Sequence, residues 1–246
     1  MGLIKSAMAD AAITSMFVFT LPFVPLLSSI VSKSLGMDPK SLSLPNLFIT
    51  ITLVAMIMLL FGTLAGALGG ASFNPAAALC FAAAGLRKPS AGEPSVIIRS
   101  AGRLPAQAGG AVIGALAVVK VMPVEYQSLL RGPVLSVDLL TGAIVEGILT
   151  FVQCLYLLVV MVKGPKLPIL KTWLMAATTI GLFMIGSGLT GPGMNPAIAF
   201  GWAYAKNRHN TWELYSVYWV GPLVGSIFAG RVFGLFFTEP VKVKKA

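Results

Sequence analysis

The chain has 246 residues, of which 57% are hydrophobic and 11% are charged. Soluble domains carry roughly 25% charged residues, so the composition excludes an ordinary water-soluble globule. A mean hydropathy of +0.87 indicates an integral membrane protein in contact with lipid. The net charge is +10, but the 18 basic residues are scattered between apolar segments. That distribution argues against a nucleic-acid partner and is typical of membrane-protein loops.

Six apolar segments are long enough to cross a bilayer, which takes about 20 residues. They lie near residues 9–31, 47–69, 95–121, 139–162, 168–189 and 214–237. The first shows no convincing signal-peptide cleavage site, so we expect it to be retained as a span. Six crossings put both termini on the same side of the membrane.

Two further apolar segments, residues 75–85 and 196–205, are too short to cross. Each follows an asparagine and begins with a proline, Pro75 or Pro196. Proline is favoured in the first turn of a helix and keeps the residue before it out of the helical region. The sequence therefore predicts two half-helices in re-entrant loops.

The chain also contains an internal repeat. Residues 74–79 (Asn-Pro-Ala-Ala-Ala-Leu) align with residues 195–200 (Asn-Pro-Ala-Ile-Ala-Phe), and the first span of each half carries one acid, Asp10 or Glu146. Three spans per half is an odd number, so the second half enters the membrane from the opposite face. We therefore expect an all-α membrane protein with an inverted 3+3 repeat, whose half-helices meet near the bilayer midplane.

Charge and repeat together give an expected topology for one domain covering 1–246, with repeats at about 1–122 and 138–237. Twelve of the 18 basic residues fall on the side of the N-terminus, so both termini and the basic tail 238–246 are expected in the cytosol. Lysines stand third and fifth from the C-terminus. They resemble a dilysine retrieval signal for the endoplasmic reticulum, although ordinary cytosolic flanking charge explains them too.

The two Asn-Pro-Ala boxes within an inverted repeat resemble the aquaporin (major intrinsic protein) family. The two boxes are Asn74-Pro75-Ala76 and Asn195-Pro196-Ala197. Further similarity lies in residues 104–107 (Leu-Pro-Ala-Gln), 190–204 and 218–225 (Tyr-Trp-Val-Gly-Pro-Leu-Val-Gly). The basic composition and the lysine-rich tail are most similar to the small basic intrinsic proteins of plants. The resemblance implies six spans with two half-helices, one pore per protomer, a homotetramer, and water or a small neutral solute as the permeant.

The chemistry of the boxes supports such a pore. A helix N-terminus carries partial positive charge and unpaired N–H groups. The side-chain amides of Asn74 and Asn195 can donate hydrogen bonds into a lumen, which orients a passing water and opposes proton or cation passage. The alternative is that each asparagine only caps its helix.

One position departs from the family pattern. The family places an arginine directly after the second box, where this chain has Ile198. By spacing, the resemblance assigns the other filter positions to Val54, Phe183 and Pro192, with Ile57 as the alternative in the second span. Four apolar walls imply slow water flux, or passage of larger neutral solutes such as glycerol or hydrogen peroxide. Alternatively, these side chains only pack against neighbouring helices.

Ionisable groups inside membrane spans are costly and point to a specific role. The matched positions of Asp10 and Glu146 predict that they accept hydrogen bonds from backbone N–H groups of the re-entrant loops. Gln107 is expected to hydrogen-bond the loop backbone as well. A proton relay, or for Asp10 a simple helix-end position, is the alternative. Gly62, Gly66, Gly69 and Gly70 are expected at close-packing or turn positions.

Other classes of function find less support. The single histidine, His209, lies in a polar segment and is expected to be a solvated loop residue, and no metal-ligand spacing accompanies it. Cys80 and Cys154 lie in apolar stretches and are expected to be buried thiols without a disulfide. We therefore expect no enzyme, cofactor or metal site. An ion-coupled transporter and a poorly conducting structural protein remain as rival hypotheses.

Overall fold

The computed structural model describes residues 2–86 and 96–237, which contain helices and connections but no strand. The helices of the first half are α1 (Leu3–Thr20), α2 (Phe23–Ser34), α3 (Leu44–Ala67), α4 (Pro75–Ala83), α5 (Val96–Ala101), α6 (Leu104–Val121) and a 3-10 helix, η1 (Val124–Leu129). Those of the second half are α7 (Leu139–Lys163), α8 (Pro168–Gly186), α9 (Pro196–Ala205), α10 (Trp212–Tyr215), a π-helical turn η2 (Ser216–Val220) and α11 (Gly221–Phe237). The dilysine tail lies outside the described residues.

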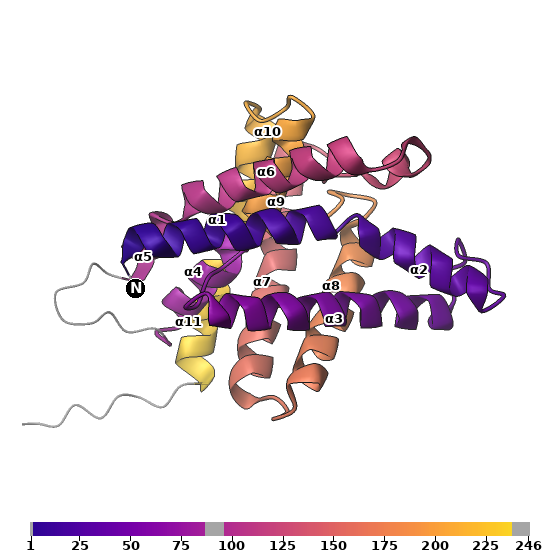
Figure 1. Ribbon diagram of the computed structural model, residues 1–246. Helices are drawn as coiled ribbons and strands as arrows, with labels where there is room; N and C mark the ends of the chain where they lie inside the picture. Colours follow the sequence, from indigo (N-terminus) through magenta and orange to yellow (C-terminus); the bar gives the residue numbers. More distant parts are fainter. Residues whose placement is uncertain (1, 87–95, 238–246) are drawn as a thin grey trace, which may run out of the picture.

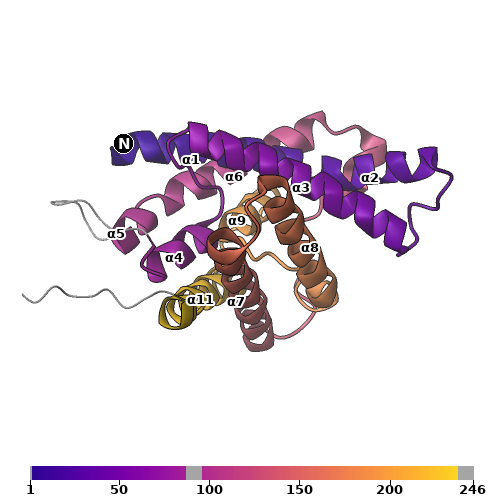
Figure 2. The same ribbon diagram turned by 90° about the horizontal axis from the view of Figure 1, so that it is seen from below.

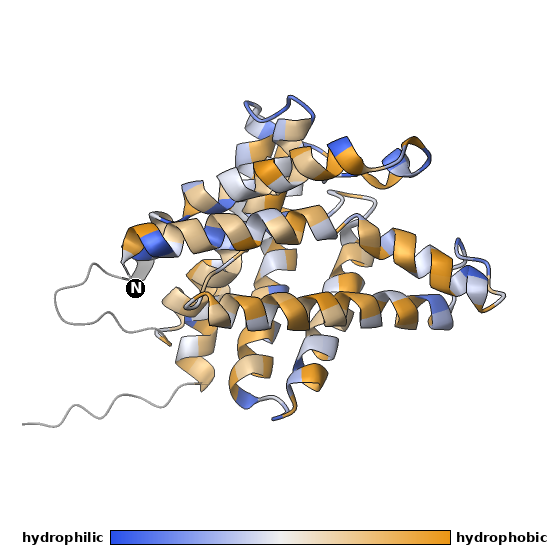
Figure 3. Ribbon diagram, in the orientation of Figure 1, coloured by the Kyte–Doolittle hydropathy of each residue, from blue (hydrophilic) through white to orange (hydrophobic). Residues whose placement is uncertain are grey.

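Six helical stretches of the described chain are long and apolar enough to cross a membrane. They are Leu3–Ser34, Leu44–Ala67, Ile98–Val121, Leu139–Lys163, Pro168–Gly186 and Trp212–Phe237. Figure 3 shows apolar residues along these stretches and hydrophilic residues gathered mainly at turns and helix ends. The prediction of an all-helical protein with six spans and two half-helices, α4 and α9, is confirmed.

Three of the spans are interrupted. The first begins at Leu3, earlier than expected, and bends where α1 ends, because Pro22 has no N–H to donate to the preceding turn. Leu21 itself keeps helical angles, with φ of −55° and ψ of −43°. The third is divided between α5 and α6. The last carries the π-helical turn η2, which was not expected from the sequence.

The half-helices pack on spans of the opposite half of the chain. Helix α4 of the first half lies along α11, and α9 of the second half lies along α6. Within each half the first span packs on the third, α1 on α6 and α7 on α11, while α3 crosses α8. Figures 1 and 2 show this arrangement, with α4 beside α11 and the spans of one half running across those of the other.

Glycines permit the closest approaches between helices. Gly110 and Gly114 bring α6 onto the backbone of α1, and Gly221 and Gly225 bring α11 onto the backbone of α7. A Cβ atom at any of the four would overlap a carbonyl oxygen of the facing helix, so larger residues would force the helices apart.

The glycines singled out in the second span behave differently. Gly69 and Gly70 form the turn after α3, with φ angles of 72° and 82°. Gly62 and Gly66 are not close-packing positions, because no described atom lies within 4 Å of a Cβ atom built on either. Small-residue spacing alone could not show which face of α3 is covered.

Candidate pore site

Each asparagine of the two boxes caps its own half-helix. Asn74 precedes Pro75, and its Oδ1 accepts from the backbone N–H of Ala76 at 2.9 Å and of Ala77 at 3.4 Å. Asn195 has the same extended backbone, and its Oδ1 accepts from the N–H of Ala197 at 3.1 Å. The caps fix the carbonyl end of each side chain, which leaves the amide nitrogens to point away from the helices.

Those nitrogens bond across to the opposite box. Asn74 Nδ2 donates to the carbonyl oxygen of Met194 at 3.4 Å, and Asn195 Nδ2 donates to that of Phe73 at 2.9 Å. In each case the acceptor is the residue directly before the other asparagine. A side-chain amide has two N–H groups, and within residues 2–86 and 96–237 the second of each amide has no protein partner. Both amides therefore retain one donor for a permeant.

Glu146 holds the loop before the second box. Its side chain is fully buried, and Oε1 accepts from the Thr190 hydroxyl at 2.7 Å and the Gly193 N–H at 3.0 Å, while Oε2 accepts from the Met194 N–H at 2.9 Å. Met194 has a φ of 45°, a left-handed conformation that residues with side chains rarely adopt. Because that backbone carries the acceptor for Asn74, the bond from Glu146 helps to keep the acceptor in place.

Asp10 holds the loop before the first box, with a different set of donors. Its buried carboxylate accepts from the Ser72 N–H at 2.7 Å, from Gln107 Nε2 at 2.9 Å, and from two N–H groups of Arg103. Arg103 also donates to the carbonyl oxygen of Gly70 at 3.2 Å. The first loop is thus held by a partly buried ion pair, whereas Glu146 has only neutral donors among the described residues.

Gln107 differs from the expectation in its partner. It donates to Asp10 rather than to the loop backbone, and its Oε1 has no hydrogen-bond partner among the described residues. It acts on the loop through the carboxylate. In the second half, Tyr218 reaches the loop itself, since its hydroxyl donates to the Thr190 carbonyl oxygen at 2.6 Å.

Several residues that shape the site were not identified from sequence. Arg103 was expected only as a cytosolic charge, and neither Thr190 nor Met194 stood out. Phe73 was missed too. In the structure its ring lies 4.3 Å from that of Phe17, in an aromatic cluster with Phe61. That packing fixes the residue whose carbonyl receives Asn195.

The sequence that forms these two capped half-helices matches a known protein family. The family model described as "Major intrinsic protein" matches residues 1–233. The chain belongs to the major intrinsic protein family. It is therefore a multi-pass membrane protein of a family of passive channels.

Several members of the major intrinsic protein family are similar along their whole length. Aquaporin SIP1-1 of Oryza sativa subsp. japonica is 44% identical over 99% of this chain and 97% of its own, and Aquaporin SIP1-2 of Zea mays is 44% identical over 98% and 96%. Aquaporin SIP1-1 of Arabidopsis thaliana is 38% identical over 100% and 98%. These relatives are small basic intrinsic proteins, the subgroup that the sequence resembled.

A solved structure shows the same fold. The X-ray structure of the aquaglyceroporin from Plasmodium falciparum matches with a TM-score of 0.68, covering 96% of this chain and 97% of its own, at 17% identity. At that identity the match concerns the arrangement of the helices only.

The four positions assigned to the major intrinsic protein filter lie on three segments of the chain. Helix α3 carries Val54, two residues after Thr52, whose hydroxyl accepts from the Trp173 indole of α8 at 3.4 Å. Helix α8 carries Phe183, ten residues after Trp173, which is about 15 Å along the helix. Phe183 is 47% exposed.

The other two positions flank Asn195. Pro192 is buried with its ring against Gly186, where a Cβ atom would overlap it. Ile198 is partly buried against the cluster that includes Ile13, Phe17 and Phe61. Ile57, the alternative to Val54, packs against the same cluster.

The remaining candidates carry no channel chemistry. Cys80 and Cys154 are buried free thiols, and Cys80 Sγ donates to the Cys154 carbonyl oxygen at 3.6 Å. His209 is partly buried rather than fully solvated, because its ring lies 4.6 Å from that of Tyr204. No group of three or more potential metal ligands occurs in the described residues.

Proposed function

We propose that the chain is a water channel whose permeant passes between Asn74 and Asn195. The observation that supports this most directly is the reciprocal bonding of the two amides, because it fixes both side chains and still leaves each with one N–H. A water oxygen that accepts from both donors must turn its own hydrogens along the pore in opposite directions. That orientation interrupts a hydrogen-bonded chain of waters and opposes proton transfer.

We further propose an apolar narrow point beside the second box. Ile198, in place of an arginine, removes a fixed charge and several donors, so exclusion of ions rests mainly on the two half-helix N-termini. Pro192 flanks the same box. Val54 and Phe183 are assigned to the narrow point by their spacing alone, and packing on a shared cluster favours Ile57 over Val54 in the second span.

Such a wall replaces few of the hydrogen bonds that water gives up on entering, so water flux is expected to be slow. A small neutral solute such as glycerol or hydrogen peroxide is the second candidate, because an isoleucine is shorter than an arginine and carries no charge. We infer that the chain has no enzymatic activity. We also propose a homotetramer with one pore per protomer, both termini in the cytosol, and residence in the endoplasmic reticulum.

The test is stopped-flow light scattering on proteoliposomes under osmotic and then glycerol gradients, with hydrogen peroxide entry followed separately. Asn195→Asp keeps the cap but removes the donor to Phe73, so we expect slower water flux and a new cation leak. Ile198→Arg should lower any solute flux and any cation leak. Asn210→Asp and Val124→Arg make the same chemical changes at exposed positions and should behave as wild type.

The outcomes separate the hypotheses. Water flux above that of empty liposomes, altered by Asn195→Asp or Ile198→Arg, supports a pore through the second box. Flux of glycerol or peroxide without water flux supports the solute channel. Flux at the lipid background from correctly folded protein refutes both and leaves a structural role. Dependence on an ion gradient, with saturation, would indicate a coupled transporter.

A further inference from the structure

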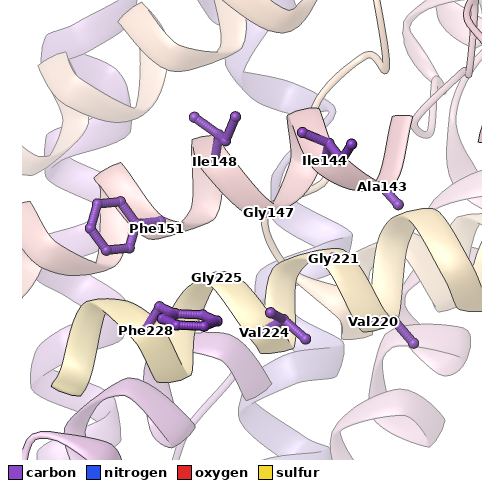
Figure 4. Close-up of a pocket in the computed structure, with 10 residues that line it drawn as sticks. All are labelled: Ala143, Ile144, Gly147, Ile148, Phe151, Val220, Gly221, Val224, Gly225 and Phe228. Atoms are coloured by element: carbon purple, nitrogen blue, oxygen red, sulfur yellow. The ribbon is translucent and has the colours of Figure 1, made fainter. Parts of the chain in front are cut away.

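An apolar groove of about 450 Å³ lies between α7 and α11 on the outside of the helix bundle. Its walls are Ile144 and Ile148 on α7, and Val224 and Phe228 on α11 (Figure 4). Glycines such as Gly147 form its floor, where the two helices approach most closely. The four wall side chains are between 45% and 61% exposed, so the groove is open to the surroundings of the protein.

The groove crosses the level of the second box and continues into one leaflet. On α7 its lining extends from Ala143 to Phe151, and Gly147 in the middle follows Glu146, which bonds the loop at the second box. On the other wall the lining extends from Val220 at the end of η2 to Phe228 on α11, which is about 12 Å of helix. One leaflet contributes about 15 Å to the hydrocarbon core. The groove thus has room for the inner half of an acyl chain from the leaflet on the side of the N-terminus.

A cation stands at the outer end of the groove. Arg231 follows Phe228 by three residues on the same face of α11 and is exposed. Within the described part of the chain it has neither a hydrogen bond nor an ion pair. Gly225 lies against the Gly147 carbonyl oxygen, and the rise from Gly225 to Arg231 is about 9 Å. Arg231 is thus attached in the outer half of the leaflet, and a long basic side chain at this depth extends toward the lipid headgroups.

Among the described residues, the charge at this end favours a lipid over a second copy of the chain. Six of the eight acids of the sequence are described, and Glu93 and Glu239 lie outside the described residues. The six are Asp10, Asp38, Glu125, Asp138, Glu146 and Glu213. Two of these are buried and already hydrogen-bonded, and the others lie at the span ends on the opposite side of the membrane. A neighbouring copy in the same orientation therefore brings none of these carboxylates to Arg231, whereas a phospholipid carries a phosphate at that depth.

We propose that the groove binds one acyl chain of an anionic phospholipid from the leaflet on the side of the N-terminus, with its phosphate on Arg231. The acyl chain fills the space between α7 and α11 beside the helix that carries Glu146. Guanidinium and phosphate form a charge-assisted pair at the interface.

The inverted repeat supplies controls on α6. Gly110 meets the carbonyl oxygen of Ala11, which follows Asp10, and Gly225 meets that of Gly147, which follows Glu146. Gly110 therefore corresponds to Gly225 and Ile113 to Phe228, and Lys120 is a cation near the end of α6. Ile113 is 61% exposed and Lys120 is exposed, and neither lines the groove. The measurement is native mass spectrometry of the delipidated full-length protein, titrated with phosphatidylglycerol and with phosphatidylcholine.

Wild type should retain one phosphatidylglycerol more tightly than all further lipids. Val224→Trp fills the groove and should abolish that site, and Arg231→Gln should weaken it by about fivefold and remove the preference for the anionic lipid. Ile113→Trp and Lys120→Gln should bind as wild type does. If Val224→Trp does not fold, Ile148→Trp fills the same groove from α7.

The proposal is overturned if the groove variants bind lipid as wild type does, or if the two control variants lose binding equally. It is also overturned if filling the groove changes the oligomeric state and leaves lipid binding intact, because the occupant is then a second copy. Lipid retention is measured without any transport, so a negative result for the lipid site does not bear on the proposed channel activity.

Discussion

The bond from Glu146 to Met194 makes the substitution Glu146→Gln a sharp test of how the second box is held. Glutamine has the same shape, and its oxygen can still accept from Thr190 and from the Gly193 N–H. Its NH2 group would then face the Met194 N–H, donor against donor, at a contact that is now a 2.9 Å hydrogen bond. The variant therefore leaves one buried backbone donor without an acceptor.

An orphaned buried N–H costs about 1–3 kcal/mol. That cost would raise the equilibrium constant for local opening of the loop by a factor of about 5 to 150. In the opposite direction, glutamine removes the cost of burying a carboxylate that no described cation neutralises. We therefore expect loosening confined to the loop, with little loss of global stability. Because the Met194 carbonyl accepts from Asn74, water flux should fall as well.

Hydrogen exchange measured by mass spectrometry on the reconstituted protein can read this loop directly. The peptide covering residues 190–197 should exchange faster in Glu146→Gln by roughly the factor above, while the peptide covering 71–77 should not change. Glu213→Gln provides the same chemical change in an exposed ion pair with Arg208 and should leave both peptides unaltered. Unchanged exchange around Met194 in Glu146→Gln would show that the carboxylate does not hold the loop.

Three further outcomes are expected. Asp10→Asn breaks an ion pair in which the carboxylate is buried and Arg103 is partly exposed, so it should destabilise the protein by up to about 3 kcal/mol, the lower end for a fully buried pair. Asp10→Asn combined with Arg103→Gln should recover part of that loss, and strictly additive losses in thermal unfolding would contradict the pairing. Gly114→Leu should prevent α6 from docking on α1 and so reduce the folded yield on size exclusion, whereas Gly109→Ala, which meets open space, should fold normally. Hydrogen bonds from the Thr141 side chain and backbone lower the pKa of Asp138 below its usual 3.8. The cap that Asp138 forms on α7 therefore stabilises the fold above pH 3.8 and is lost as the pH falls through the lowered pKa. A helix signal from α7 that is unchanged from pH 7 to 4 and falls only below pH 3.8 checks this.

Local signals in the sequence were sufficient for the helices. The start of each half-helix is set by an asparagine and a proline in adjacent positions, so it could be predicted without any knowledge of packing. The bend in the first span was equally readable, because Pro22 lies within it, although the prediction treated 9–31 as continuous. Hydrophobicity over about 20 residues does not register a single break.

Interactions between distant residues could not be predicted in the same way. The repeat indicated that Asp10 and Glu146 are equivalent, but not that one is paired with a cation and the other is not. Arg103 lies 93 residues from Asp10, and its position near a span end suggested only a topological charge. The filter positions stay a prediction for a related reason, since spacing along the chain does not determine the angle at which α3 crosses α8.

The exchange of half-helices between the two halves has a consequence for the order in which the protein is made. Helix α4 is synthesised within the first 83 residues, but the surface that receives it belongs to α11, where Gly230 lies against the Cys80 carbonyl oxygen. The half-helix of the first box therefore lacks its packing partner until nearly the entire chain has left the ribosome. Helix α9 is the opposite case, because α6 is synthesised before it. The first re-entrant loop to be translated is thus the last to be completed.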